Sequence, residues 1–179
     1  MDSLIQYSPK KPDLIIGDLD SLSSKSKDTF LNQTLKIEDQ NKNDLTKAVE
    51  FAISKKAEKI ILLGTSGGRE DHAIANFSLY FEYAKKCANK IDLKIYTDHG
   101  KISVVKSGQK IKSFIGEKIS FFTENSTVVL NCIDLKWPLV NKSFDSFWQG
   151  SLNESLSDEL VVEFKNGVCL VFQNYTNKI

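Results

Sequence analysis

Short apolar runs alternate with amphipathic segments over the first half of the chain. The runs Leu14–Gly17, Ile60–Gly64 and Leu93–Tyr96 are continuous rather than alternating, which is typical of strands buried on both faces of a parallel sheet. Between them, two segments carry apolar residues at helical spacing: Leu45, Ala48, Val49, Ala52 and Ile53 in the first, and Ile74, Phe77, Phe81 and Ala84 in the second. The pattern therefore predicts an α/β layer with a parallel sheet.

The pattern changes after Gly100 to short strand-like segments separated by Gly, Asn, Ser and Asp. These segments are ISVV, KISFF, TVVL, ELVVEF and VCLVF. The last two flank Lys165–Gly167, and the Asn-Gly pair within it predicts a hairpin. We therefore expect two domains that join directly near residue 99. Residues 1–99 would form an α/β domain and residues 100–179 an all-β sandwich or barrel.

Charge and composition exclude several classes of partner. The formal net charge of +1 gives no broad attraction for nucleic acid or an anionic membrane. The three cysteines, Cys87, Cys132 and Cys169, lie far apart without a CxxC pair, which argues against a disulfide framework or a zinc site. No apolar run reaches the roughly 20 residues that span a bilayer, and the start MDSLIQYSPKKPD lacks a signal pattern. These features predict a cytoplasmic protein.

The first candidate site is the segment GDLDS, Gly17–Ser21, at the carboxyl end of a predicted strand. Asp18 and Asp20 are two residues apart and would face the same side of a continuing strand. Paired carboxylates at such a strand end are well placed to hold Mg²⁺ through oxygen ligands and water. A polar turn that merely ends the strand explains the same residues.

The second candidate site is the segment DQNKND, Asp39–Asp44, which leads into the first predicted helix. Asp44 has a structural role as N-cap or first-turn acid, which stabilises a helix by roughly 1 kcal/mol. That role accounts for Asp44 alone. It does not account for Glu38 and Asp39, which return to the edge where Asp18 and Asp20 are expected.

The third candidate site is the segment GTSGGREDH, Gly64–His72, between a predicted strand and a long helix. Backbone N–H groups converge on an anion at such a junction. Gly67 and Gly68 allow close approach of the backbone, Arg69 adds a bidentate cation, and Asp71 lies in the first helical turn. A glycine-rich turn with an acid favoured by the helix dipole is the structural alternative. The Lys-Ser/Thr ending of a Walker A loop is absent.

The C-terminal half contributes Trp137, which precedes a proline, and a small polar loop, Gly150–Ser155. Trp137 and Trp148 can both be ordinary core or surface aromatic residues without a ligand. A tryptophan near a polar loop also suits stacking on a flat heteroaromatic ligand or a cation. The sequence alone does not choose between these two interpretations.

Taken in order, these segments resemble the thiamin pyrophosphokinase family. PDLIIGDLDS is similar to its GD-x-DS motif, DQNKNDLTKAVEFA to its second acidic segment, and LLGTSGGREDHAIAN to its G-x-x-GGR-x-DH-x-x-x-N motif. GEKISFF, DLKWPL, GSLNE and the final strand–Gly–strand resemble landmarks of its C-terminal domain. The resemblance implies transfer of diphosphate from ATP to thiamin, with AMP as second product, by a homodimer that binds thiamin between subunits.

The resemblance also implies roles for particular residues. Asp18, Asp20, Asp44 and Asp71 would face Mg²⁺ and phosphate, with Asp71 or Asp44 as the candidate base. The ATP site would include Gly67, Gly68, Arg69 and Asn76. Trp137 and Asn153 would lie near thiamin.

Two departures from the family pattern and two alternatives accompany this interpretation. The D-GG-AN segment that usually opens the nucleotide site is not found before Pro12, so we expect the first strand to be missing and ATP affinity to be weak. Leu152 stands where members often have the serine of S-N-E. One alternative is a haloacid-dehalogenase-like phosphatase with Asp18 as nucleophile, although Ser21 stands where it needs Thr or Val. The other is a non-catalytic binder of thiamin or nucleotide.

Overall fold

The computed structural model describes residues 10–20, 22–87 and 90–175. Ser21 and the expectation about the start of the chain at Met1 therefore lie outside the described residues. The chain folds as two compact units, Met1–Ala57 and Glu58–Ile179. Within the described ranges, no helix has the length and apolar character needed to cross a bilayer.

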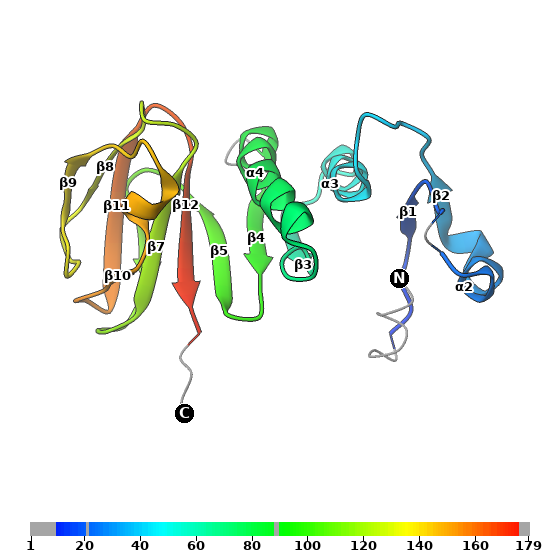
Figure 1. The fold of residues 1–179 in the computed structure, drawn as a ribbon, viewed down its shortest axis with the longest axis horizontal. Helices are drawn as coiled ribbons and strands as arrows, with labels where there is room; N and C mark the ends of the chain where they lie inside the picture. The colour runs from blue at the N-terminus through cyan, green and yellow to red at the C-terminus, as the bar shows by residue number, and fades with distance from the viewer. Residues whose placement is uncertain (1–9, 21, 88–89, 176–179) are drawn as a thin grey trace. The chain divides into compact units, whose positions relative to one another are not determined.

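The first unit is built on a short parallel pair of strands (Figure 1). Its elements are β1 (Ile15–Gly17), α2 (Ser24–Thr29), η1 (Leu31–Gln33), β2 (Thr34–Lys36) and α3 (Asp44–Ser54). Ile15, Leu22 and Phe30 form its small core. Helix α3 begins after Asn43, whose side chain accepts a hydrogen bond from the Thr46 backbone N–H at 2.9 Å. Asn43 is therefore the N-cap, and Asp44 is a first-turn acid.

The second unit contains a six-stranded and a four-stranded sheet. The six-stranded sheet has the order β10-β7-β12-β5-β4-β3, formed by Asn153–Glu154, Lys118–Thr123, Cys169–Asn174, Gly100–Val105, Asp92–Tyr96 and Lys59–Leu63. The four-stranded sheet has the order β6-β11-β8-β9, formed by Gln109–Lys112, Glu159–Lys165, Val129–Cys132 and Leu139–Lys142. Helix α4 (Glu70–Cys87) connects β3 to β4, and η2 (Phe147–Gly150) precedes β10.

The two sheets of the second unit share one apolar core. Ile119, Phe121 and Val171 point into it from the six-stranded sheet, and Leu160 and Val162 do so from the four-stranded sheet. Side chains alternate across a strand, so Phe122 lies on the opposite face of the sheet from Phe121. There it packs against Phe77 of α4, with ring centroids 5.2 Å apart. The large sheet is thus covered by the small sheet on one face and by α4 on the other.

The β-rich character of the C-terminal half is confirmed, whereas a single parallel α/β sheet in the first half is not found. In the described residues, β1 pairs with β2, and β3 pairs in parallel with β4. These pairs belong to different sheets, and β4 continues antiparallel into β5 through Ile95↔Ile102. The predicted boundary near residue 99 lies in the turn between β4 and β5, inside one sheet, and stays a prediction.

The predicted hairpin at Lys165–Gly167 is wrong. Asn166 and Gly167 do turn the chain, with φ of 64° and 136°. However, β11 pairs with β6 and β8, while β12 pairs with β5 and β7. Both strands direct side chains into the shared core, so the turn carries the chain from one sheet to the other. Turn chemistry predicts a reversal of the chain, but not the strand that each arm joins.

The apolar stripe of α4 also differs from its prediction. Phe81 and Ala84 are buried, but Ile74 is 72% exposed. Tyr80 and Tyr83 are buried in its place. The Tyr80 hydroxyl lies 2.6 Å from the Thr65 hydroxyl, and such a partner allows an aromatic side chain with a polar tip to enter a core.

Candidate functional site

The acidic segment after β1 forms a turn rather than a continuing strand. Strand β1 ends at Gly17, Leu19 has φ 67°, and the Asp20 backbone N–H donates to Asp18 Oδ1 at 3.0 Å. The strand alternation used to place Asp18 and Asp20 on one side therefore does not apply. They are nevertheless brought together, because both line a cavity of about 280 Å³ with Lys27 and Lys36.

Lys36 adds positive charge to this acidic segment. Its hydrogen bond to Glu38, 2.7 Å long, raises the pKa of Lys36, and the negative charges of Asp20 and Asp18 raise it further. The Lys36 ammonium is therefore charged at neutral pH and stands beside two carboxylates. A cavity lined by both signs suits a ligand that carries phosphates together with a cation.

Asp44 is held against the end of β1. A Cβ added to Gly17 would lie only 2.7 Å from Asp44 Cγ, so glycine lets the carboxylate come directly beside the residue that precedes Asp18. Lys47, one helical turn later, donates to Asp44 Oδ1 at 3.1 Å, and its side chain is 3% exposed. The pair fixes the orientation of the Asp44 carboxylate, which is 48% exposed. Sequence reasoning missed Lys47.

The glycines of the loop between β3 and α4 have backbone conformations that leave room for close approach, as the sequence predicts. Gly64, Gly67 and Gly68 have φ of 66°, 79° and 69°, a region that side chains rarely adopt. Arg69 and Asp71 form a bidentate pair, with Nε–Oδ1 at 3.1 Å and Nη2–Oδ2 at 2.6 Å. Arg69 lowers the pKa of Asp71. The proposed phosphate-binding cation and the proposed metal-facing acid are therefore partners of one another.

Asn76 and Tyr80 anchor this loop to α4. Asn76 Nδ2 donates to the Thr65 carbonyl oxygen at 3.0 Å, and the Tyr80 hydroxyl contacts the same residue. Thr65 directly follows the first glycine of the loop and is buried. Asn76 is thus occupied in fixing the base of the loop. Thr65 and Tyr80 were missed, although a tyrosine four residues after Asn76 on a helix is a detectable signal.

The donor atoms of these residues fit a hard divalent cation. Asp18, Asp20 and Asp44 offer carboxylate oxygens, the ligands that Mg²⁺ prefers. Among the residues that the structure describes, no three His, Cys, Asp or Glu side chains come together as a metal-binding group. Mg²⁺ is commonly bound through one or two carboxylates and the phosphates of a substrate, so the first unit suits a cation that arrives with a nucleotide. Asp71 belongs to the second unit.

A second cavity lies in the β-rich part and has a volume of about 670 Å³. Its lining includes both tryptophans, which are largely exposed: Trp137 at 56% and Trp148 at 74%. The Lys136 ammonium lies 5.1 Å from the centroid of the Trp137 ring, which shows that this ring accepts a cation. Leu152 lies on the rim with φ 60° and is 79% exposed.

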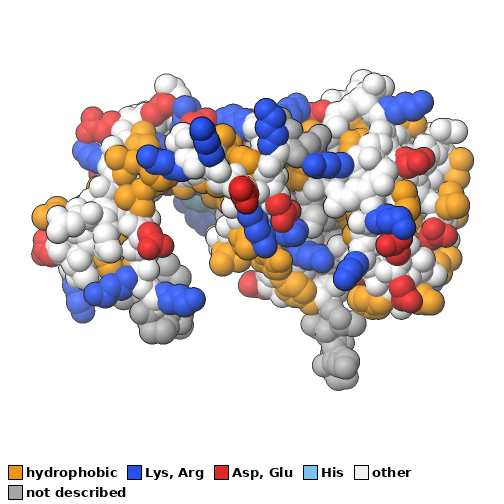
Figure 2. Space-filling model, turned by 180° about the vertical axis from the view of Figure 1, so that it is seen from behind, with side chains coloured by type: hydrophobic (Ala, Val, Ile, Leu, Met, Phe, Trp, Pro, Cys, Tyr) orange, Lys and Arg blue, Asp and Glu red, His pale blue; other side chains and the backbone are white. Residues whose placement is uncertain are grey.

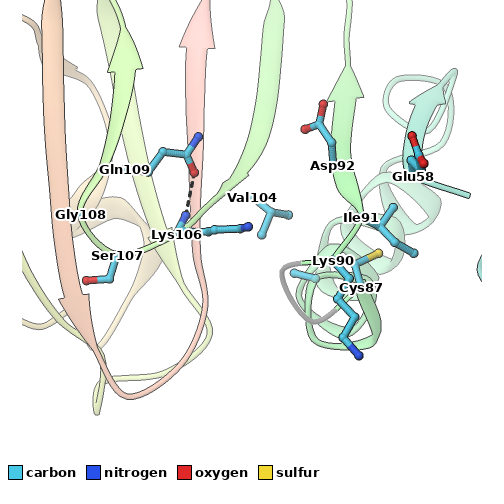
Figure 3. Close-up of a pocket in the computed structure, with 11 residues that line it drawn as sticks. Glu58, Cys87, Lys90, Ile91, Asp92, Val104, Lys106, Ser107, Gly108 and Gln109 are labelled. Carbon is cyan, nitrogen blue, oxygen red and sulfur yellow. Dashed lines mark hydrogen bonds between the residues drawn. The ribbon is translucent and has the colours of Figure 1, made fainter.

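Another cavity, of about 600 Å³, contains none of the residues predicted from the sequence as site residues. Lys90 and Lys106 line it together with Glu58 and Asp92 (Figure 3). The Lys106 backbone N–H donates to Gln109 Oε1 at 2.9 Å and closes the turn after β5. The lining thus combines basic and acidic side chains. Figure 2 likewise shows basic and acidic side chains interspersed on the face in view, in keeping with the net charge of +1.

Two family profiles match this chain in succession. Residues 3–92 match the profile described as thiamin pyrophosphokinase, catalytic domain, and residues 100–172 match thiamin pyrophosphokinase, substrate-binding domain. The chain is 32% identical over 84 residues to thiamine pyrophosphokinase 1 of Oryza sativa subsp. japonica, covering 41% of this chain and 32% of that protein. The chain is 39% identical over 79 residues to thiamine pyrophosphokinase 3 of the same plant, covering 38% of this chain and 30% of that protein. The match thus spans about a third of these curated relatives.

Solved structures of similar fold cover nearly the whole chain. Thiamine pyrophosphokinase from Bacillus subtilis superposes with a TM-score of 0.77 at 20% identity, over 97% of this chain and 83% of that one. Thiamin pyrophosphokinase from Candida albicans superposes with a TM-score of 0.78 at 18% identity, over 97% of this chain and 78% of that one. Yeast thiamin pyrophosphokinase superposes with a TM-score of 0.77 at 18% identity, over 99% of this chain and 77% of that one. These likenesses establish the fold.

Proposed function

The chain belongs to the thiamin pyrophosphokinase family, and from this premise we propose that it transfers a diphosphate from ATP to the hydroxyl of thiamin, giving thiamin diphosphate and AMP. The observation that carries the proposal is the succession of both family domains along one chain, residues 3–92 and 100–172. The acidic turn after β1 and the glycine-rich arginine loop after β3 supply the groups that such a reaction needs. In this proposal residues 1–99 serve ATP and residues 100–179 serve thiamin.

The acidic residues would serve the phosphates and their counter-ion. Asp18, Asp20 and Asp44 would hold Mg²⁺, which when bound neutralises the negative charge of the triphosphate, and Asp71 would serve the phosphates from the loop after β3. Lys47 would keep Asp44 in one orientation, because its buried ammonium donates to Asp44 Oδ1. The Arg69 guanidinium lowers the pKa of Asp71. Asp44 and Asp71 are both candidate acceptors for the proton of the thiamin hydroxyl.

The loop after β3 would stabilise charge on the transferred group. Gly67 and Gly68 leave open space beside the backbone, where an added Cβ would meet nothing within 4 Å. Their N–H groups and the Arg69 guanidinium would donate to phosphate oxygens. Arg69 would exchange its bond to Asp71 for one to phosphate, while Asn76 keeps the base of the loop in place. Positioning and electrostatics supply most of the acceleration in phosphoryl transfer.

The tryptophan-lined cavity would receive thiamin, whose thiazolium ring is a flat cation. Trp137 supports this assignment because its exposed ring already carries the Lys136 ammonium. We also place the protein in the cytoplasm, where Cys87, Cys132 and Cys169, which are free and buried, stay reduced.

The activity test is the identity of the second product. The purified chain, incubated with ATP, Mg²⁺ and thiamin, is expected to form AMP and thiamin diphosphate in equal amounts, measured by chromatography. Omission of thiamin or removal of the metal by a chelator is expected to stop AMP formation. Thiamin-independent release of inorganic phosphate with a trapped phosphoenzyme would instead support the phosphatase, and binding without AMP would support the non-catalytic alternative.

We further propose a two-fold symmetric homodimer with thiamin at its interface. Four large apolar residues in and around the tryptophan-lined cavity are more than half exposed: Trp137, Val140, Trp148 and Leu152. Exposed apolar groups of this size mark contact surfaces. Leu152→Glu should therefore shift the sedimenting species from dimer to monomer at micromolar concentration, because the charge would be buried against the partner.

Leu31→Glu provides the matched control, since Leu31 is a leucine of similar exposure, 71%, in the first unit. This variant is expected to sediment like the unmodified protein. An unmodified protein that is monomeric and still binds thiamin tightly would contradict the interfacial site.

A further inference from the structure

The side chain of Asn153 is bonded to both backbone groups of Trp137. Asn153 Nδ2 donates to the Trp137 carbonyl oxygen at 2.7 Å, and the Trp137 backbone N–H donates to Asn153 Oδ1 at 3.2 Å. The carboxamide thereby imitates a neighbouring strand. It extends a backbone pairing that already includes Leu135↔Ser155 and the bond from Lys136 N–H to the Glu154 carbonyl oxygen, 2.9 Å long.

These bonds leave Asn153 little capacity for a ligand. Its Oδ1 also accepts from the Glu154 backbone N–H at 2.8 Å, which fills both lone pairs of a carboxamide oxygen. The residue is only 6% exposed, although it belongs to the lining of the tryptophan-lined cavity. Trp137, by contrast, is 56% exposed.

Trp137 depends on this contact because of the residue that follows it. Pro138 has no N–H group and cannot tie the chain down from the other side. The proline restricts the Trp137 backbone to extended conformations, but it adds no hydrogen bond that fixes the peptide groups in place. The carboxamide of Asn153 fixes the peptide groups on either side of the Trp137 Cα, and this sets the direction in which the ring leaves the backbone.

We propose that Asn153 is a positioning residue, which holds the Trp137 ring as the stacking surface for a cationic heteroaromatic ring without touching that ligand itself. The proposal rests on the proposed function for the identity of the ligand, thiamin. Its structural part, the control of Trp137 by Asn153, holds in the absence of any ligand.

The first experiment uses no ligand. In a Trp148→Phe background Trp137 is the remaining tryptophan, since the chain has two, and its fluorescence anisotropy and quenching by acrylamide report its mobility. Asn153→Ala is expected to lower the anisotropy and raise the quenching. Asn153→Asp is nearly isosteric and removes the donor to the Trp137 carbonyl, so it should act in the same direction if the alanine variant does not fold.

Asn131→Ala is the matched control. Asn131 Oδ1 accepts a hydrogen bond from the Asn141 backbone N–H at 2.8 Å, between β8 and β9. Its loss removes a comparable side-chain-to-backbone bond that does not involve Trp137, so the anisotropy should stay unchanged. Equal anisotropy in the Asn153 variants and the unmodified background would overturn the proposal.

The second experiment is a double-mutant cycle on thiamin affinity, measured by calorimetry in the unmodified protein, Asn153→Ala, Trp137→Ala and the double variant. A residue that acts through Trp137 loses its effect when Trp137 is removed. We expect Asn153→Ala to weaken binding about tenfold, as the loss of one or two hydrogen bonds typically does, and to add nothing in the Trp137→Ala background.

The outcomes separate the inference from the proposed function. Additive losses of affinity would show a direct contact between Asn153 and thiamin and would overturn the positioning role. If the unmodified protein does not bind thiamin while Asn153→Ala still mobilises Trp137, the control of Trp137 by Asn153 is supported and the proposed function is contradicted.

Discussion

Asp18→Asn is expected to lower kcat by about 10²- to 10³-fold, the usual effect of removing one preorganised charge from a phosphoryl-transfer site. The amide keeps an oxygen at the position of Oδ1, so the hydrogen bond from the Asp20 backbone N–H, 3.0 Å long, can persist. The turn after β1 should therefore form, and only the negative charge facing the metal and phosphates is lost. The measurement is steady-state AMP formation, accompanied by a thermal melt.

Asp28→Asn is the control for this prediction. Asp28 is an exposed carboxylate on α2 in the same unit, so its neutralisation should change neither kcat nor the melting temperature. Because Asp18 would act on the cation, raising the Mg²⁺ concentration should restore part of the rate of Asp18→Asn. Near-normal AMP formation by this variant at low Mg²⁺ would refute the assignment of the acidic turn.

The elements that the sequence predicts well are those whose signal is local. The runs predicted at Leu14–Gly17, Ile60–Gly64 and Leu93–Tyr96 correspond to β1, β3 and β4, since apolar stretches this short, bounded by turn residues, favour a strand over a helix. Helix α3 begins at Asp44, where an Asn-Asp pair and the helical spacing coincide. Strand β2 was missed because its pairing with β1 is non-local, and α2 because Ser26 is its only buried residue.

The candidate site was predictable in its residue types but not in its pairings. The glycine loop, its arginine and the acidic turn follow from short motifs. The ion pair between Lys47 and Asp44 requires a lysine at the buried face of α3, whereas a lysine in the middle of a helix normally indicates a solvated face. The hydrogen bonds between Asn153 and Trp137 join strand β10 to the segment before β9, and the proximity of the two depends on the pairing of Leu135 with Ser155.

Arg69→Ala is expected to lower kcat/KM for ATP by about 100-fold or more, because a guanidinium aimed at phosphate stabilises charge in the transition state. The folded protein should be unaffected. Arg69 is 76% exposed and its partner Asp71 61%, and exposed ion pairs contribute little to folding stability because solvent screens them. The Arg69→Ala variant should therefore lose kcat/KM while its melting temperature stays unchanged.

Lys110→Ala tests whether any surface ion pair would give the same result. Lys110 pairs with Glu159 at 2.8 Å, with side chains 70% and 49% exposed, and no functional motif includes it. Its loss should leave both kinetics and melting unchanged. Arg69→Lys keeps the charge but loses the planar fork that binds two oxygens at once, so its rate should fall between those of the alanine variant and the unmodified protein. An Arg69→Ala protein with unaltered kcat/KM would reduce the Arg69–Asp71 pair to an ordinary surface contact and remove the phosphate-binding role of the loop.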